Sequence, residues 1–270
     1  MRHRDCAIGI RTSLSRRPRL PGPLESNYTE TTEGNVTDSE LLQRVRGCRL
    51  ADLGDGMDAI GLVNTGTMSS NMRPIRPGIR FTGFAYTVKL VPAQDEAGAC
   101  GSVDDYMKRL GDWCSDTYAF MAGFRNGGAK DKVCVIDMGG YPGGVWGSEN
   151  GLSTMKEGLV GAVIDGGCRD SYECNLENVN VFCTQRTFNH VYGRLRNGGV
   201  EVPVSCAGVL VNPGDVVCAD DDGVLVIPRS RVEEVLEFAV AVLHGDQRAR
   251  AKHYRDLGYA PDETLGDAGR

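Results

Sequence analysis

The segment Val160-Gly-Ala-Val-Ile-Asp-Gly-Gly-Cys-Arg-Asp170 gives the strongest indication of fold in this 270-residue chain. An apolar run that ends in two glycines is typical of a buried strand followed by a tight turn. The turn presents Arg169 and Asp170 side by side. A guanidinium group can bind a carboxylate, and a carboxylate oxygen is a ligand for hard divalent cations. Spacing alone, however, favours the simpler interpretation of a β-turn with a local ion pair.

A glycine-rich segment, Trp146-Gly-Ser-Glu-Asn-Gly-Leu152, lies upstream of this strand and precedes a helix expected over about residues 150–157. Glycine allows a close approach of the backbone to a ligand, and the amides at a helix N-terminus favour an anion. The two segments together predict the order strand, loop, helix, strand and turn.

The rest of the chain has two parts with different secondary-structure patterns. Helices and strands alternate first, and short strands separated by turns follow. Thr37 and Glu40 have the spacing of a capping box and open the first helix. The other expected elements are a helix from near Asp55, strand 81–91, helix 104–124, strands 132–138, 160–164, 179–183, 202–205, 209–211, 216–219 and 224–227, and helix 229–255.

These elements predict a mixed α/β protein with one domain over residues 37–256 and a C-terminal tail over residues 257–270. Residues 1–36 are expected to form a disordered or poorly ordered tail. Six arginines and a single acidic residue occupy the first 20 positions, and few apolar residues are available to offset the entropy of ordering.

Composition narrows the class of protein. The formal net charge is −6, which disfavours a general nucleic-acid-binding protein. No apolar run approaches the roughly 18 residues of a membrane-spanning helix. The ten cysteines contain no C-x-x-C pair, which argues against a zinc ribbon or a thioredoxin motif. For a chain of this length without a signal peptide we expect reduced, mostly buried thiols and a cytoplasmic location. We expect neither nucleic-acid nor membrane partners.

Four segments, in the same order along residues 37–250, resemble the RraA-like family. They are Gly83–Val88, Val160–Asp170, Pro213–Val217 and Asp220–Arg229. This family includes class II pyruvate aldolases, which act on 4-hydroxy-4-methyl-2-oxoglutarate and 4-carboxy-4-hydroxy-2-oxoadipate, and regulators of ribonuclease E. The resemblance implies a three-layer β/β/α (swivelling-domain) fold and a homotrimer or homohexamer with its sites at subunit boundaries.

The resemblance also implies roles for individual residues. Arg169 would contact the carboxylate and oxo group of a 2-oxo acid, and Asp170 would coordinate Mg²⁺ or Mn²⁺ largely through waters. Backbone amides of the loop would bind the pyruvate carboxylate, which makes Gly147, Ser148, Glu149 and Asn150 substrate-binding residues together with Arg169. Asp246 would reach the site from the C-terminal helix of a neighbouring subunit.

One residue departs from the aldolase pattern. That pattern has an acidic residue 21 positions before the arginine, where this chain has Ser148 and then Glu149. Either Glu149 substitutes for the missing carboxylate, or the chain lacks it. The stretch from Ala97 to Lys130 is also longer than is usual in the family and could reshape the pocket.

The resulting hypothesis is a divalent-metal-dependent carbon–carbon lyase that cleaves a 4-hydroxy-2-oxo acid to pyruvate and also decarboxylates oxaloacetate. Its catalytic residues are expected to be Arg169, Asp170, Glu149 and Asp246, with Asp170 as the metal ligand. One alternative is a lyase, isomerase or dehydratase that acts on another hydroxy acid or sugar acid by the same chemistry. The other is a non-catalytic ribonuclease-regulator-like binding protein.

Three further residues near these motifs are expected to be structural. A lone histidine such as His190 more often accepts or donates a structural hydrogen bond than takes part in catalysis. Cys168 is expected to be an inert or redox-sensitive thiol, because no matched histidine is visible. Asp165 is expected to shape the turn or to support the site from behind.

Overall fold

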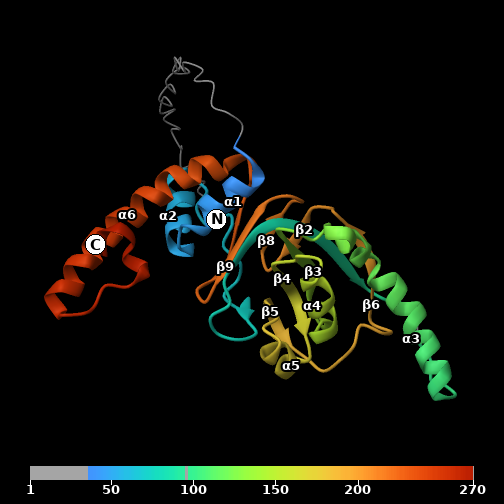
Figure 1. The fold of residues 1–270 in the computed structure, drawn as a ribbon. Helices are drawn as coiled ribbons and strands as arrows, with labels where there is room; N and C mark the ends of the chain where they lie inside the picture. The colour runs from blue at the N-terminus through green and yellow to red at the C-terminus, as the bar shows by residue number, and fades with distance from the viewer. Residues whose placement is uncertain (1–35, 95–96, 270) are drawn as a thin grey trace, which may run out of the picture. The chain divides into compact units, whose positions relative to one another are not determined.

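The computed structural model describes residues 36–94 and 97–269, and the N-terminal tail expected over residues 1–36 lies outside them except for Val36. Its central element is the long strand β2 (Phe81–Pro92) (Figure 1). One edge of β2 pairs in parallel with β3 (Lys132–Trp146). The other edge pairs antiparallel with β9 (Val216–Asp220) at its start and with β6 (Leu195–Val200) at its end.

The large sheet has the order β1-β5-β4-β3-β2-β9-β10, with β6 also on β2. Strands β2, β3, β4 (Gly161–Cys168) and β5 (Val181–Arg186) are parallel, and their centres are completely buried. This burial explains the uninterrupted apolar runs, since a parallel strand has both faces covered. The outer strands β1 (Arg73–Pro74) and β10 (Gly223–Ile227) pair antiparallel with β5 and β9.

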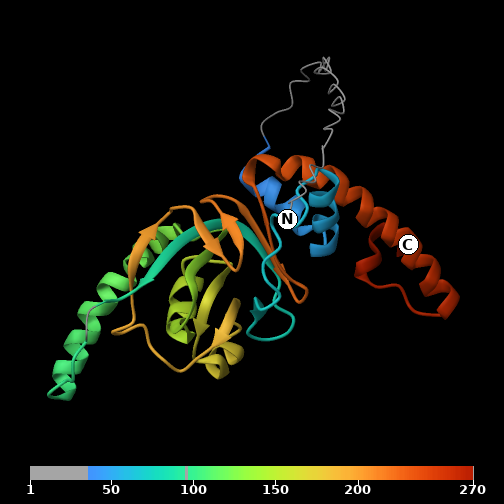
Figure 2. The ribbon, with the colours of Figure 1, turned by 180° about the vertical axis from the view of Figure 1, so that it is seen from behind.

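Two smaller layers cover this sheet. Helices α4 (Ser148–Met155) and α5 (Ser171–Leu176) connect the parallel strands on one face (Figures 1 and 2). The hairpin of β7 (Val204–Cys206) and β8 (Val209–Val211) lies on the other face and shares the core of the sheet. The expected three-layer β/β/α fold is therefore confirmed.

Buried acidic side chains attach this hairpin to the sheet. Asp137 on β3 accepts hydrogen bonds from the amide of Ser205 (3.1 Å) and from Lys89 Nζ (2.5 Å). Asp165 on β4 accepts one from the amide of Ala207 (3.0 Å). Asp165 thus holds the hairpin against the sheet. Asp137, for which no role was expected, does the same.

A second core lies between β9, β10 and three helices that lie side by side in both views (Figures 1 and 2). They are α1 (Asp38–Arg46), α2 (Leu50–Ala59) and α6 (Val232–Leu257), the last preceded by the short η2 (Arg229–Arg231). The residues expected to form a C-terminal tail include η3 (Glu263–Gly269), whose Leu265 is fully buried. No helix in the described part of the chain is both long and apolar enough to cross a membrane.

Several expected boundaries were wrong. Helix α2 begins at Leu50, not near Asp55, and the helix expected over 104–124 is α3 (Val103–Thr117) followed by η1 (Ala119–Gly127). The strand expected over residues 132–138 continues to Trp146 as the irregular second half of β3, with register shifts against β4 between Asp137 and Trp146. Strand β6 and helix α5 were not predicted.

Candidate functional site

The proposed site lies where β3 and β4 end at the same edge of the sheet. Trp146 pairs with Cys168 in the sheet, and the amide of Arg169 donates a hydrogen bond to the carbonyl of Trp146 (2.9 Å). The two turns that follow, from β3 into α4 and from β4 into α5, are therefore neighbours. Ligands of parallel α/β sheets bind at this carboxyl edge.

Asp170 closes directly over the first of these turns. It adopts the left-handed conformation (φ 54°, ψ 39°) before α5. A Cβ atom placed on Gly147 would lie 2.2 Å from Asp170 Oδ2. Position 147 therefore admits only glycine while the carboxylate stays where it is. Arg169 Nε lies 3.5 Å from the same Oδ2, and both side chains are 36% exposed.

The N-terminus of α4 supplies the opposite wall. The first amides of a helix have no intrahelical acceptor, and in α4 these belong to Ser148, Glu149 and Asn150. Asn150 Nδ2 donates to the carbonyl of Val145 (2.9 Å), which fixes this turn. The structure thus brings together a guanidinium group, a carboxylate and the first amides of a helix. The guanidinium and the amides are suited to bind a small anion, and the carboxylate offers oxygen atoms beside it.

Helix α3 brings in residues that were not predicted for the site. Tyr118 lines the same cavity as Asn150, and burial raises the pKa of the Tyr118 phenol well above its ordinary value. Burial also raises the pKa of the Cys114 thiol, an effect that nearby Arg169 opposes. The unusual length of the segment from Ala97 to Lys130 was the only sequence signal for this wall.

A cavity of about 750 Å³ separates α3 and η1 from α4. Its lining includes both polar and apolar residues: Cys114, Tyr118, Met121, Arg125, Glu149, Asn150, Ser153 and Lys156. Because Glu149 and Asn150 belong to the anion-binding turn, the cavity extends the proposed site toward the α3 segment.

His190 also belongs to this neighbourhood. Its Nδ1 accepts a hydrogen bond from the amide of Tyr192 (3.1 Å), and its ring centroid lies 6.4 Å from that of Tyr118. Burial, followed by the charges of Arg169 and Arg194, lowers the pKa of His190 below its ordinary value. The expected structural hydrogen bond is present, but it is made beside the site.

Cys168 is fully buried at the end of β4. Hydrogen bonds with Cys174 and Cys183, together with burial, raise the pKa of Cys168. A thiol in this state is a poor nucleophile, in line with the expected inert role.

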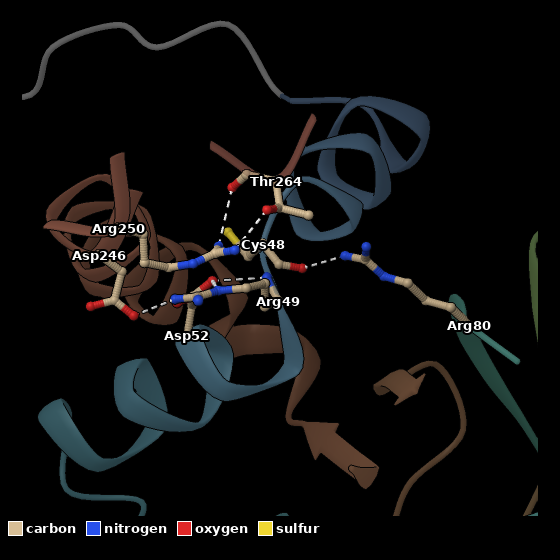
Figure 3. Close-up of polar contacts among 7 residues, drawn as sticks. All are labelled: Cys48, Arg49, Asp52, Arg80, Asp246, Arg250 and Thr264. Atoms are coloured by element: carbon tan, nitrogen blue, oxygen red, sulfur yellow. Dashed lines mark hydrogen bonds and ion pairs between the residues drawn. The ribbon is translucent and has the colours of Figure 1, made fainter. Parts of the chain in front are cut away.

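Asp246 has a different set of neighbours in the chain. Its carboxylate accepts a hydrogen bond from Arg49 Nη2 (2.6 Å), and Arg49 also binds the fully buried Asp52 (Figure 3). The contact joins α6 to α2. The structure of one chain therefore does not bring Asp246 to Arg169 and Asp170, and its expected role depends on a second subunit.

The side chains near Asp170 determine how a divalent cation could be held at this site. Residues 36–94 and 97–269 contain no group of three or more His, Cys, Asp or Glu side chains placed to hold a metal. The partly exposed Asp170 carboxylate nevertheless fits a cation such as Mg²⁺, which is commonly held by one or two carboxylates and keeps several waters. Asp170 is the residue that could hold a cation there.

Known proteins share both the sequence pattern and the fold of this chain. The model of the RraA-like family, described as Aldolase/RraA, matches residues 50–226, a range that includes Arg169 and Asp170 but not Asp246. Protein DlpA of Legionella pneumophila is 28% identical over 232 residues, which are 84% of this chain and 34% of DlpA. A protein of Halalkalibacterium halodurans named "Putative 4-hydroxy-4-methyl-2-oxoglutarate aldolase" is 36% identical over 99 residues, 37% of this chain and 46% of that one. The chain thus spans about a third to a half of the length of these relatives.

Solved structures show the same fold. RraAS2 of Streptomyces coelicolor, described as an unusual member of the RNase ES inhibitor RraA family, aligns with a TM-score of 0.65 and 24% identity over 80% of this chain and 98% of its own. An uncharacterised protein of Pseudomonas syringae aligns with a TM-score of 0.62 and 24% identity over 86% of this chain and 98% of its own.

Proposed function

This chain belongs to the RraA-like family, and from that premise we propose that it is a divalent-metal-dependent carbon–carbon lyase that cleaves a 4-hydroxy-2-oxo acid to pyruvate. The observation that carries the proposal is the placement of Arg169 and Asp170 over Gly147, at the free amides of α4. The relatives named as aldolases support the reaction class.

The residues divide the work of binding. Arg169 and the amides of Ser148 to Asn150 would hold the carboxylate of the 2-oxo acid, because both present N–H donors to an anion. Asp170 would hold Mg²⁺ or Mn²⁺. A bound cation would supply Lewis-acid polarisation of the 2-oxo group.

Cleavage then requires a base and an electron acceptor. The base removes the proton of the C4 hydroxyl, the C3–C4 bond breaks, and its electron pair moves into the 2-oxo acid as an enolate stabilised by Arg169. Glu149, exposed in the first turn of α4, is one candidate to orient the water that acts as the base. Asp246 of a neighbouring subunit in a trimer or hexamer is the other. The same electron acceptor would allow oxaloacetate to lose CO₂.

Two observations keep other functions in view. Ser148 replaces the usual acidic residue, which favours a lyase, isomerase or dehydratase acting on a different hydroxy acid as the second candidate. The fold shared with RraAS2 supports a ribonuclease-inhibitor role as the third. Retention of Asp170 favours an enzyme over a regulator, since regulators of the family tend to lack the acidic partner of the arginine.

The direct test is pyruvate release from a panel of 4-hydroxy-2-oxo acids and oxaloacetate, measured with lactate dehydrogenase and NADH. We expect activity with Mg²⁺ or Mn²⁺, none after chelation, and recovery when the metal is returned. Asp170→Asn, which keeps the shape of the side chain, should lower kcat by at least ~10²-fold, because the ligand charge is lost. Glu173→Gln, which removes a charge from the exposed face of α5, is the matched control and should leave activity unchanged. Full activity of Asp170→Asn or of the chelated protein would overturn the metal role.

A further inference from the structure

His190 lies in the connection between β5 and β6, and its backbone is bound to the end of β3. The amide of Gly144 donates to the carbonyl of Asn189 (2.9 Å), and Gly144 forms an isolated parallel bridge with His190. A Cβ atom on Gly144 would lie 2.6 Å from that carbonyl and 3.1 Å from both Cβ and Cδ of Arg169. Gly144 thus lies between the backbone of Asn189 and His190 on one side and the Arg169 side chain on the other. Only this glycine, which has no side chain, separates them.

The imidazole ring is also close to the wall formed by α3. Its centroid is 6.4 Å from the ring of Tyr118, which lines the same cavity as Asn150 of the anion-binding turn. The imidazole ring therefore has both Tyr118 and the charge of Arg169 nearby. The guanidinium of Arg194 donates to the carbonyls of His190 and Tyr192 (3.1 Å each) and holds the connection in this conformation.

The hydrogen bond at Nδ1 determines what the ring can offer a ligand. Nδ1 accepts the amide proton of Tyr192, so in the neutral ring the remaining proton is on Nε2. Nε2 makes no hydrogen bond to any residue in 36–94 or 97–269, and the residue is partly exposed. The ring is therefore a preoriented N–H donor with an unused proton at the edge of the site.

We propose that His190 is a substrate-contacting residue whose Nε2–H donates a hydrogen bond to the oxygen on which negative charge develops as the C3–C4 bond breaks. The inference rests on the proposed function for the identity of that oxygen, the former 2-oxo oxygen. His190 neither gains nor loses a proton in this role. A neutral donor fixed before the reaction stabilises the oxyanion without the cost of reorganisation.

Two variants separate the donor from the ring. His190→Phe keeps a planar ring and removes the proton, whereas His190→Gln keeps an N–H donor on a side chain of similar reach. We expect His190→Phe to lower kcat by about 10²–10³-fold, the usual effect of losing one oxyanion donor, with KM changed by less than about threefold. His190→Gln should keep most of the activity that His190→Phe loses. The exposed His253 on α6 provides the control His253→Gln, which should behave as wild type. Equal kcat values for the wild type and His190→Phe would overturn the proposal.

Two further measurements do not require turnover. Side-chain ¹⁵N NMR of the wild-type protein, assigned by the signals missing in His190→Gln, should show the Nε2–H tautomer, and an Nδ1–H tautomer would contradict the proposal. Oxalate, a planar mimic of the enolate of pyruvate, should bind in the presence of Mg²⁺ and bind at least about tenfold more weakly to His190→Phe. Thermal unfolding of each variant identifies any loss due to misfolding.

These measurements distinguish the two proposals from each other. If the wild type releases no pyruvate from any substrate but His190→Phe loses oxalate binding, the proposed reaction fails, whereas His190 stands as a hydrogen-bond donor to an enolate-like oxygen of another substrate. If the wild type is active and the variant matches it in both assays, the role of His190 fails and the reaction stands.

Discussion

At the scale of single residues, the site depends on Gly147 having no Cβ atom. Gly147 has extended backbone angles (φ −163°, ψ −163°), which any residue can adopt, so conformational freedom does not explain the glycine. Its reason is steric, because Asp170 Oδ2 occupies the space of a Cβ atom. The glycine at 147 and the carboxylate at 170 therefore form a matched pair across two turns.

Gly147→Ala tests this match. The added methyl group must displace the Asp170 carboxylate, and we expect kcat for pyruvate release to fall by at least about tenfold, since a 1 Å misplacement of a reacting group can cost about 10²-fold. Folding should be almost unaffected. The control is Gly111→Ala, at an α3 position with no atom within 4 Å of the new Cβ, which should keep activity and slightly stabilise the helix. Equal activity of the two variants would show that the carboxylate position does not matter.

Ser148 allows the reverse experiment. Ser148→Asp restores a carboxylate at the position that is acidic in the aldolase pattern, and a negative charge in the first turn of α4 is favourable for the helix. We expect kcat on 4-hydroxy-2-oxo acids to rise by about tenfold, less than the 10²–10⁴-fold that a well-placed acid or base supplies. Ser148→Ala is the comparison and should change little. A loss of activity in Ser148→Asp would indicate a substrate group that needs the serine, and hence the second candidate function.

At the scale of elements, the hairpin of β7 and β8 shows how buried charge positions a layer. Asp137 is 2% exposed and accepts hydrogen bonds from Lys89 Nζ, the amide of Ser205 and the amide of Gly139 (2.9 Å). Each donor would lose its protein acceptor if the carboxylate were removed. The single side chain therefore joins β2, β3 and the hairpin.

We expect Asp137→Ala to lower the free energy of unfolding by about 2–3 kcal/mol, because a buried donor without a partner costs about 1–3 kcal/mol and Lys89 can still reach water. Urea unfolding followed by circular dichroism measures the change. Lys89→Met completes a double-mutant cycle, and a coupling energy near zero would mean that the ion pair does not hold the hairpin.

The sequence predicted elements well where the burial pattern is local. Strand β8 was expected at its observed position, and the capping box of α1 is confirmed, with Glu40 Oε2 accepting from the amide of Thr37 (2.8 Å). The start of α2 was missed because Arg49, an uncommon residue for a helix cap, precedes it. Strand β6 contains Gly198 and Gly199, which hide the strand pattern. The partner that stabilises β6 is the distant strand β2, which no local pattern of residues 195–200 reveals.

The same limit applies to the site. Adjacent glycines and an Arg-Asp pair indicate a turn, whereas the expected roles of Arg169 and Asp170 came from the resemblance to the RraA-like family. Tyr118 was part of an apolar stripe expected to pack in the core, and it does pack against the core while also lining the cavity beside Asn150. A helical pattern identifies the buried face of a helix. It does not show which residue at the end of that helix contacts a loop elsewhere in the chain.

At the scale of the whole molecule, the expected role of Asp246 requires a second subunit. It lies outside the range matched by the family model, and within one chain it binds Arg49 between α2 and α6 (Figure 3). The carboxylate is 54% exposed, so it can contact a second subunit while it keeps this ion pair. A shared site between subunits predicts a specific behaviour of mixed assemblies.

Arg169→Ala and Asp246→Ala should each be nearly inactive alone if Asp246 completes the site of its neighbour. When the two variants are co-expressed in equal amounts with different tags, a ring of three contains sites with both native residues, and random mixing restores about a quarter of the wild-type activity. Tandem affinity purification isolates the mixed trimers, and light scattering measures their mass. A mixture of Arg169→Ala with Asp170→Asn is the control and should stay inactive, because both losses fall on the same half of the site. Inactive mixed trimers in the first pair, or full activity of Asp246→Ala alone, would show that Asp246 only joins α6 to α2.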